Sequence, residues 1–153
     1  MPIRHPLVRA VFLFLMLAAV APAMAISPVN RTLLGGLAID GYDPVAYFLD
    51  GKPIEGKKAH SFVWNDATWR FATAAHRELF VKSPESYAPQ YGGYCAWAVS
   101  QGYTAGIEPE AWTVRDGKLY LNYDLEIQEK WRADLPGLIA KGDANWPGLL
   151  AEK

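Results

Sequence analysis

Two separate stretches of the chain have aromatic or aliphatic residues at every second position, and each predicts a β-hairpin. The first spans residues 61–71 and turns at Asn65-Asp66-Ala67, so its aromatic residues are expected to share one face. The second spans residues 112–121 and turns at Asp116-Gly117, the strongest two-residue hairpin signal in the sequence. The inner face of this second hairpin is predicted to consist of Trp112, Val114, Leu119 and Leu121.

Capping residues predict helices before, between and after the hairpins. Asp43-Pro44 has the composition of a helix start, and Thr73 and Asp124 are N-caps of apolar segments that follow them. Two further helices are expected from Tyr94 to Val99 and from Asp134 toward Trp146. The strands lie in separate hairpins rather than in alternating βαβ units, so the predicted fold is α+β, with two β-hairpins and several short helices.

The first 25 residues have the features of a secretory signal peptide. Arg4 and Arg9 precede the apolar run Ala10–Val20, and no acidic residue is present. The pattern Ala23-Met24-Ala25 then provides a cleavage site. The apolar run is shorter than the roughly 20 residues of a membrane-spanning helix. We therefore expect cleavage after Ala25, no transmembrane segment in the mature chain, and a periplasmic or secreted location.

The mature chain is expected to form one domain after a short lead-in. Residues 26–36 are predicted to be a flexible lead-in, because proline and polar residues interrupt any periodicity. Residues 37–150 form the predicted domain, which keeps all six tryptophans for its core. Without residues 1–25, 13 basic residues remain against 16 acidic ones, a formal net charge of −3. This balance gives no electrostatic basis for binding nucleic acid.

The segment Tyr87–Val99 contains the strongest candidate for chemistry. It holds Cys95, the only cysteine, two residues after Gly93 and among four aromatic residues. A cysteine in the first turn of the predicted helix would be favoured as a thiolate by the helix dipole. A single cysteine in an oxidising compartment cannot form an internal disulfide, so Cys95 is either buried, reactive, a metal ligand or linked to another molecule.

Four segments resemble small exported YHS-domain proteins of bacteria. These segments are Gly41–Phe48, Trp69–Ala72, Tyr87–Ala96 and Asp143–Pro147. The resemblance runs from about Ile39 to Pro147 and implies a compact α+β domain. It also implies a link to heavy metals, because cysteine-bearing members of that family are associated with metal handling and are often attached to copper-transporting ATPases.

The chain departs from the metal-linked members at their cysteine positions. Those members have Asp-Pro-Val-Cys and later Phe-Cys-x-x-x-Cys, whereas this chain has Ala46, Ala72 and His76 at the corresponding positions. A thiolate site of the family's type therefore does not transfer to this chain. The remaining candidate metal ligands are Cys95, His76 and His60, a set whose thiol and imidazoles suit a copper or zinc ion.

Each candidate residue also has a structural interpretation. Cys95 can be a small buried hydrophobe, His76 a partly buried and hydrogen-bonded histidine, and His60 a solvated one. Gly92-Gly93 can serve a tight turn alone. The functional alternative is a small-molecule cleft beside Cys95, with the candidate ligand-binding residues Tyr91, Gly92, Gly93, Tyr94 and Trp97.

Three functional hypotheses follow. The first is an exported binding module that holds a copper or zinc ion or a small ligand near Cys95. The alternative is an interaction module with a protein partner in the periplasm and no metal. The third is a cysteine–histidine enzyme in which Asp43 or Asp40 orients a histidine base. Because no motif tied to a reaction is present, the sequence assigns no catalytic residue.

Overall fold

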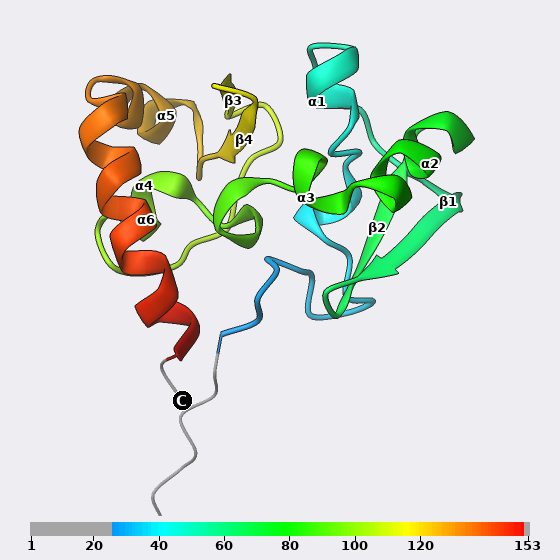
Figure 1. Ribbon diagram of the computed structural model, residues 1–153, viewed down its shortest axis with the longest axis horizontal. Coiled ribbons are helices and arrows are strands. Elements are labelled where there is room, and N and C mark those ends of the chain that lie inside the picture. The colour runs from blue at the N-terminus through cyan, green and yellow to red at the C-terminus, as the bar shows by residue number, and fades with distance from the viewer. Residues whose placement is uncertain (1–25, 152–153) are drawn as a thin grey trace, which may run out of the picture.

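The computed structural model describes residues 26–151 and has the predicted α+β class (Figure 1). Within this part of the chain, two antiparallel hairpins are accompanied by α-helices and two short 3-10 turns. In chain order the elements are η1 (Ile39–Gly41), α1 (Ala46–Leu49), β1 (Lys57–Trp64), β2 (Ala67–Phe71), α2 (Ala74–Lys82), α3 (Pro84–Tyr87), η2 (Gln90–Gly93), α4 (Ala96–Ser100), β3 (Trp112–Arg115), β4 (Lys118–Leu121), α5 (Leu125–Arg132) and α6 (Leu135–Ala151). None of the helices in residues 26–151 combines the length and apolar character needed to cross a membrane.

The first hairpin packs against α2 through its aromatic side chains. Phe62 pairs with Trp69 and Trp64 with Ala67, which gives the predicted hairpin. Its turn is Asn65-Asp66, one residue shorter than predicted, because Ala67 belongs to β2. Phe80 of α2 is fully buried against Phe62, Trp64, Trp69 and Phe71, with ring centroids 5.0 to 6.4 Å apart. These rings form much of one hydrophobic core.

The second hairpin lies between this core and a second one. Trp112 pairs with Leu121 and Arg115 with Lys118, in the register expected for a turn at Asp116-Gly117. Leu119 and Leu121 belong to the first core, whereas Tyr120 belongs to the second, together with side chains of α4, α5 and α6. Strand β4 is therefore buried on both faces. Figure 1 shows the first hairpin with α1 and α2 on one side of the molecule, and the second hairpin with α4, α5 and α6 on the other.

Two of the three predicted N-caps, Thr73 and Asp124, are confirmed, whereas α1 begins at Ala46 and has Val45 as its N-cap residue. Asp43 Oδ1 accepts hydrogen bonds from the backbone N–H groups of Val45 and Ala46, at the start of α1. The Thr73 side chain accepts from the first turn of α2, and the Asp124 side chain does the same for α5. Each cap satisfies a backbone donor that the helix itself leaves free.

Several local predictions were wrong. Val114 is 37% exposed and does not belong to the buried face of its hairpin. The last helix is longer than predicted, because α6 continues through Pro147 to Ala151. Packing of α6 against α4 offsets the backbone hydrogen bond that Pro147 cannot make. The helix after Gly92-Gly93 begins only at Ala96, so Cys95 is its N-cap residue.

The segment predicted as a flexible lead-in makes specific contacts with the domain. Val29 is buried in the first core, and the Asn30 backbone N–H donates to the carbonyl of Gly92 at 2.8 Å. The Asn30 side chain donates to the carbonyl of Gly93, and the Tyr94 hydroxyl donates to the carbonyl of Ser27. These contacts fix the lead-in against η2. The predicted signal peptide, residues 1–25, lies outside the described residues.

Candidate functional site

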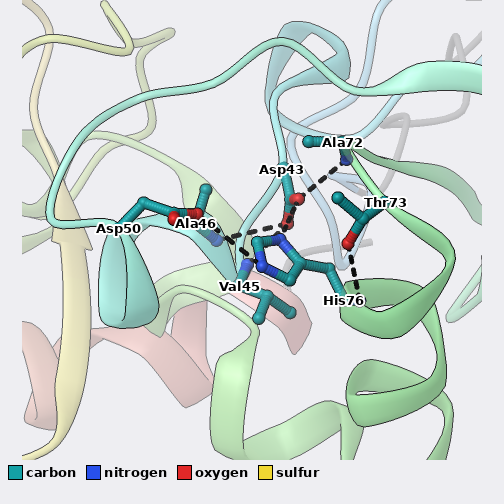
Figure 2. A network of polar contacts seen from close by, with 7 residues as sticks. All are labelled: Asp43, Val45, Ala46, Asp50, Ala72, Thr73 and His76. Carbon is teal, nitrogen blue, oxygen red and sulfur yellow. Dashed lines mark hydrogen bonds and ion pairs between the residues drawn. The ribbon is translucent and has the colours of Figure 1, made fainter.

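A buried carboxylate organises the region between α1 and α2 (Figure 2). Asp43 is 0% exposed, and its Oδ1 holds the start of α1. Its Oδ2 accepts from the backbone N–H of Ala72 at 2.8 Å and contacts Nδ1 of His76 at 2.6 Å. Both carboxylate oxygens of Asp43 are hydrogen-bonded. Because the donors come from the start of α1, the residue after β2 and a side chain of α2, Asp43 connects these three elements.

His76 is oriented by this carboxylate. The hydrogen bond to Asp43 requires a proton on Nδ1, so Nε2 of the neutral ring has a free lone pair. Nε2 points toward Oδ2 of Asp50, which lies 3.6 Å away at the end of α1 (Figure 2). The side chains of His76 and Asp50 are 12% and 39% exposed, so water reaches this side of the imidazole. An aspartate–histidine pair is therefore present, as the third hypothesis requires, but Cys95 is not among the contacts of His76.

The three positions at which metal-linked YHS proteins have cysteines meet in this region. Ala46 and Ala72 donate their backbone N–H groups to Asp43, and His76 binds the same carboxylate with its ring. Positions far apart in the sequence thus converge on one buried acid. In this chain a hydrogen-bonded pair of Asp43 and His76 occupies the region where the resemblance implies thiols.

Cys95 lies in a different environment. Its side chain is buried, and Sγ donates a weak hydrogen bond to Oδ1 of Asn122 at 3.6 Å. The same oxygen accepts from the backbone N–H of Trp97 at 3.1 Å. Burial raises the pKa of the Cys95 thiol above its usual value, so desolvation outweighs the backbone hydrogen bonds that favour a thiolate. The expectation of an activated thiolate was wrong.

We expect Cys95 to react slowly with a water-soluble thiol reagent. Its rate should be at least about ten-fold below that of the unfolded chain, because the sulfur is buried and protonated. The rise of the rate with pH should also be displaced to higher pH than for free cysteine, since the raised pKa delays ionisation. Stopped-flow labelling with and without denaturant measures both effects. Labelling as fast as that of free cysteine at neutral pH would contradict this account.

The candidate metal ligands are not brought together. His76 contacts Asp43 and Asp50, Cys95 contacts Asn122, and His60 lies half-buried in β1. Among residues 26–151, no group of three or more His, Cys, Asp or Glu side chains has an arrangement that could hold a metal ion. The predicted set of Cys95, His76 and His60 therefore does not form a three-ligand centre in this structure.

The candidate ligand-binding residues divide between two separate hollows. One, which we call the Cys95 hollow, has a volume of about 190 Å³. Its lining includes Cys95, Trp97, Tyr103, Ala105, Tyr123 and Ile127. The other, which we call the tryptophan cleft, has a volume of about 360 Å³. Its lining includes Trp64, Trp69, Glu85, Tyr91, Asp143 and Trp146.

The predicted residues fall on both sides of this division. Trp97 lines the Cys95 hollow, whereas Tyr91 and Gly92 line the tryptophan cleft. Gly93 and Tyr94 line neither of the two: a Cβ on Gly93 would meet Ile39, and the Tyr94 hydroxyl bonds to the lead-in. A single cleft beside Cys95 formed by all five residues is therefore not present.

Sequence analysis missed several residues of these sites. Asp50 and Asn122 follow α1 and β4, and nothing in the local pattern connects them with His76 or Cys95. Tyr103 and Tyr123, which line the Cys95 hollow, were not among the predicted ligand-binding residues. The single usable signal was Asn122 itself, a polar residue directly after the apolar strand Leu119–Leu121.

Comparison of the chain with models of protein families, with curated proteins and with solved structures gives no significant match in any of the three.

Proposed function

We propose that the chain is an exported binding module of the YHS type that holds a small aromatic or apolar ligand in the Cys95 hollow. The observation that carries this proposal is the composition of the hollow, in which rings and aliphatic groups surround a protonated thiol. Tyr103 and Tyr123 are 48% and 55% exposed at this hollow, so it is open to solvent. Apolar surfaces of this kind bind small ligands mainly by removing them from water.

The size of the hollow limits the ligand. A volume of about 190 Å³ is slightly larger than the engineered cavities that bind benzene, at about 150 Å³. A single aromatic ring with one small substituent therefore fits, and a drug-sized molecule does not. The two tyrosine hydroxyls are the polar groups available to orient such a ring, because Cys95 is only 1% exposed and its Sγ already bonds to Asn122.

The YHS assignment and the export are part of the same proposal. The YHS assignment is supported by the convergence of Ala46, Ala72 and His76 on Asp43, since those are the three positions at which the resemblance implies cysteines. Export is supported by residues 1–25, which have the features of a signal peptide cleaved after Ala25. The function of the module is then to bind its ligand outside the cytoplasm.

Fluorobenzene is a suitable probe, and its binding can be followed by fluorine NMR. We expect saturable binding to the purified protein. The Ala105→Leu variant should bind at least ten-fold more weakly, because three added carbon atoms occupy the hollow. Ala140→Leu makes the same change at an exposed position of α6 and should leave binding unchanged.

Two outcomes would contradict the proposal. One is the absence of saturable binding to the wild-type protein, and the other is equal binding to Ala105→Leu. Parallel titrations with Cu(I), Cu(II) and Zn(II) test the metal form of the binding hypothesis. If the protein binds metal stoichiometrically and both Cys95→Ser and His76→Ala lose this binding, the ligand of the module is a copper or zinc ion and not an organic molecule.

A second candidate function is an interaction module with a periplasmic protein partner. Leu33 and Leu34 are adjacent, belong to the turn of the lead-in, and are 103% and 92% exposed. Two fully exposed leucines at one turn favour contact with another protein. Replacing both with serine should abolish a partner interaction while leaving fluorobenzene binding intact.

A further inference from the structure

The tryptophan cleft is a separate site that the proposed function does not use. It is formed by segments far apart in the sequence: the lead-in, the first hairpin, α3, η2 and α6. Figure 1 shows α6 and the first hairpin on different sides of the molecule, with the lead-in between them at the lower edge. The cleft volume of about 360 Å³ lies within the range of natural small-molecule sites.

Four aromatic rings line this cleft as two pairs. Trp64 and Trp69 of the first hairpin have ring centroids 6.0 Å apart, at an interplanar angle of 54°. Tyr91 of η2 and Trp146 of α6 have centroids 6.1 Å apart, at 60°. In each pair one ring is buried, Trp69 or Tyr91, and the other is partly exposed, Trp64 or Trp146. The two partly exposed rings, Trp64 and Trp146, come from different elements, the first hairpin and α6.

The charged residues of the cleft have one sign. Glu85 and Asp143 are both exposed at its wall, and none of the described residues that line it is Lys, Arg or His. Neither carboxylate forms an ion pair with a basic residue within residues 26–151. Two uncompensated acids therefore face a space lined with aromatic rings.

Asp143 is held in place by Tyr91. The Tyr91 hydroxyl donates to Asp143 Oδ1 at 2.9 Å. The carbonyl oxygen of Ile139 lies 3.3 Å from the Tyr91 hydroxyl oxygen and is a second acceptor for it. Burial raises the pKa of Tyr91 far above its usual value, with the neighbouring Asp143 contributing, so the hydroxyl remains protonated and keeps donating. A Cβ on Gly142 would overlap the Tyr91 hydroxyl, which shows how closely the tyrosine packs against α6. The Asp143 carboxylate is thus held at the wall of the cleft.

We propose that the tryptophan cleft binds a small organic cation, of the quaternary ammonium or protonated amine class. Aromatic faces attract such cations through their quadrupole, and tryptophan does so best. The two carboxylates add attraction for the positive charge and disfavour anions. A trimethylammonium group also has apolar methyl surface that the rings can cover, which a hydrated metal ion does not offer. The cleft volume accommodates a cation of the size of choline.

Choline and its uncharged isostere 3,3-dimethyl-1-butanol are the probes for this site. Tryptophan fluorescence reports binding directly, because Trp64 and Trp146 line the cleft. We expect saturation by choline and at least ten-fold weaker binding of the neutral isostere. Sodium chloride at matched ionic strength should not reproduce the fluorescence change. Equal affinity for the two probes, or no saturation by choline, would overturn the proposal.

Charge-neutralising variants test the role of each acid. Asp143→Asn retains an acceptor for the Tyr91 hydroxyl, and Glu85→Gln alters an exposed side chain for which no protein hydrogen bond is observed within the described residues. Each should weaken choline binding by about three- to ten-fold. Glu78→Gln makes the same charge change on the exposed face of α2 and should have no effect. Unchanged affinity in both Asp143→Asn and Glu85→Gln would contradict the site.

These measurements are independent of the Cys95 hollow. Ala105→Leu fills that hollow and should leave choline binding unchanged, while Glu85→Gln should leave fluorobenzene binding unchanged. Failure of one site is therefore distinguishable from failure of the other. If choline and fluorobenzene compete for the same site, the assignment of a cation to the tryptophan cleft is wrong.

Discussion

Replacing Asp43 with alanine is expected to lower the free energy of unfolding by about 3–5 kcal/mol. The carboxylate is fully buried and accepts from the backbone N–H groups of Val45, Ala46 and Ala72 and from the ring of His76. The substitution leaves these donors without their acceptor in a region that water reaches poorly. Urea unfolding followed by tryptophan fluorescence measures the loss.

Asp50→Ala is the matched control for this substitution. Asp50 is 39% exposed and its contact with His76 is 3.6 Å long, so its removal should cost less than about 0.5 kcal/mol. If Asp43→Ala costs less than about 1 kcal/mol, the role assigned to the buried carboxylate is wrong. A double-mutant cycle of Asp43→Asn with His76→Gln then isolates the share that belongs to the pair itself.

The substitution Gly92→Ala should have an effect of similar size for a different reason. The φ angle of Gly92 is +62°, where a side chain is disfavoured, and an added Cβ would lie 2.1 Å from the carbonyl oxygen of Pro28. The lead-in would have to move, which breaks its hydrogen bond from Asn30 to Gly92 and exposes Val29. We expect a loss of at least about 3 kcal/mol in the free energy of unfolding, measured by urea denaturation.

Gly51→Ala separates the two causes of this loss. Gly51 has the same φ of +62°, but nothing lies within 4 Å of an added Cβ. Its substitution should therefore cost only the backbone strain, about 1 kcal/mol. Equal losses in Gly92→Ala and Gly51→Ala would mean that the contact between η2 and the lead-in adds no stability.

Local signals in the sequence predicted much of the fold. The N-caps at Thr73 and Asp124 depend on a side chain and a backbone group within a few residues, so the sequence contains everything needed to identify them. The same holds for the turn at Asp116-Gly117, where Asp116 has a positive φ of 52°. These local signals were predicted correctly, whereas the burial of Val114 and the first residue of α4 were not.

The candidate site was less predictable because its contacts are long-range. Cys95 and His76 were grouped with His60 as candidate metal ligands because of their side-chain chemistry. That chemistry does not determine how far apart the side chains lie in the fold. His76 is paired with Asp43, 33 positions earlier, and Cys95 with Asn122, 27 positions later. The suggestion that Asp43 orients a histidine matches the observed contact, whereas the common metal site required a proximity that the fold does not provide.

The length of α6 shows the same limit. As a local rule, a proline such as Pro147 interrupts a helix. The fold overrides it, because α6 packs along α4 and places Trp146 against Tyr91 and Tyr94. Tertiary packing thereby extends the helix beyond the point where propensity would end it, and this extension builds one wall of the tryptophan cleft.

Strand β4 has a consequence for how the molecule opens. Its leucines pack into one core and its tyrosine into the other, so neither half can unfold without exposing a face of the same strand. The two halves therefore form one cooperative unit, and local opening of either is suppressed by the stability of the other. A molecule bound on one side of the strand raises the protection of backbone amides on the opposite side.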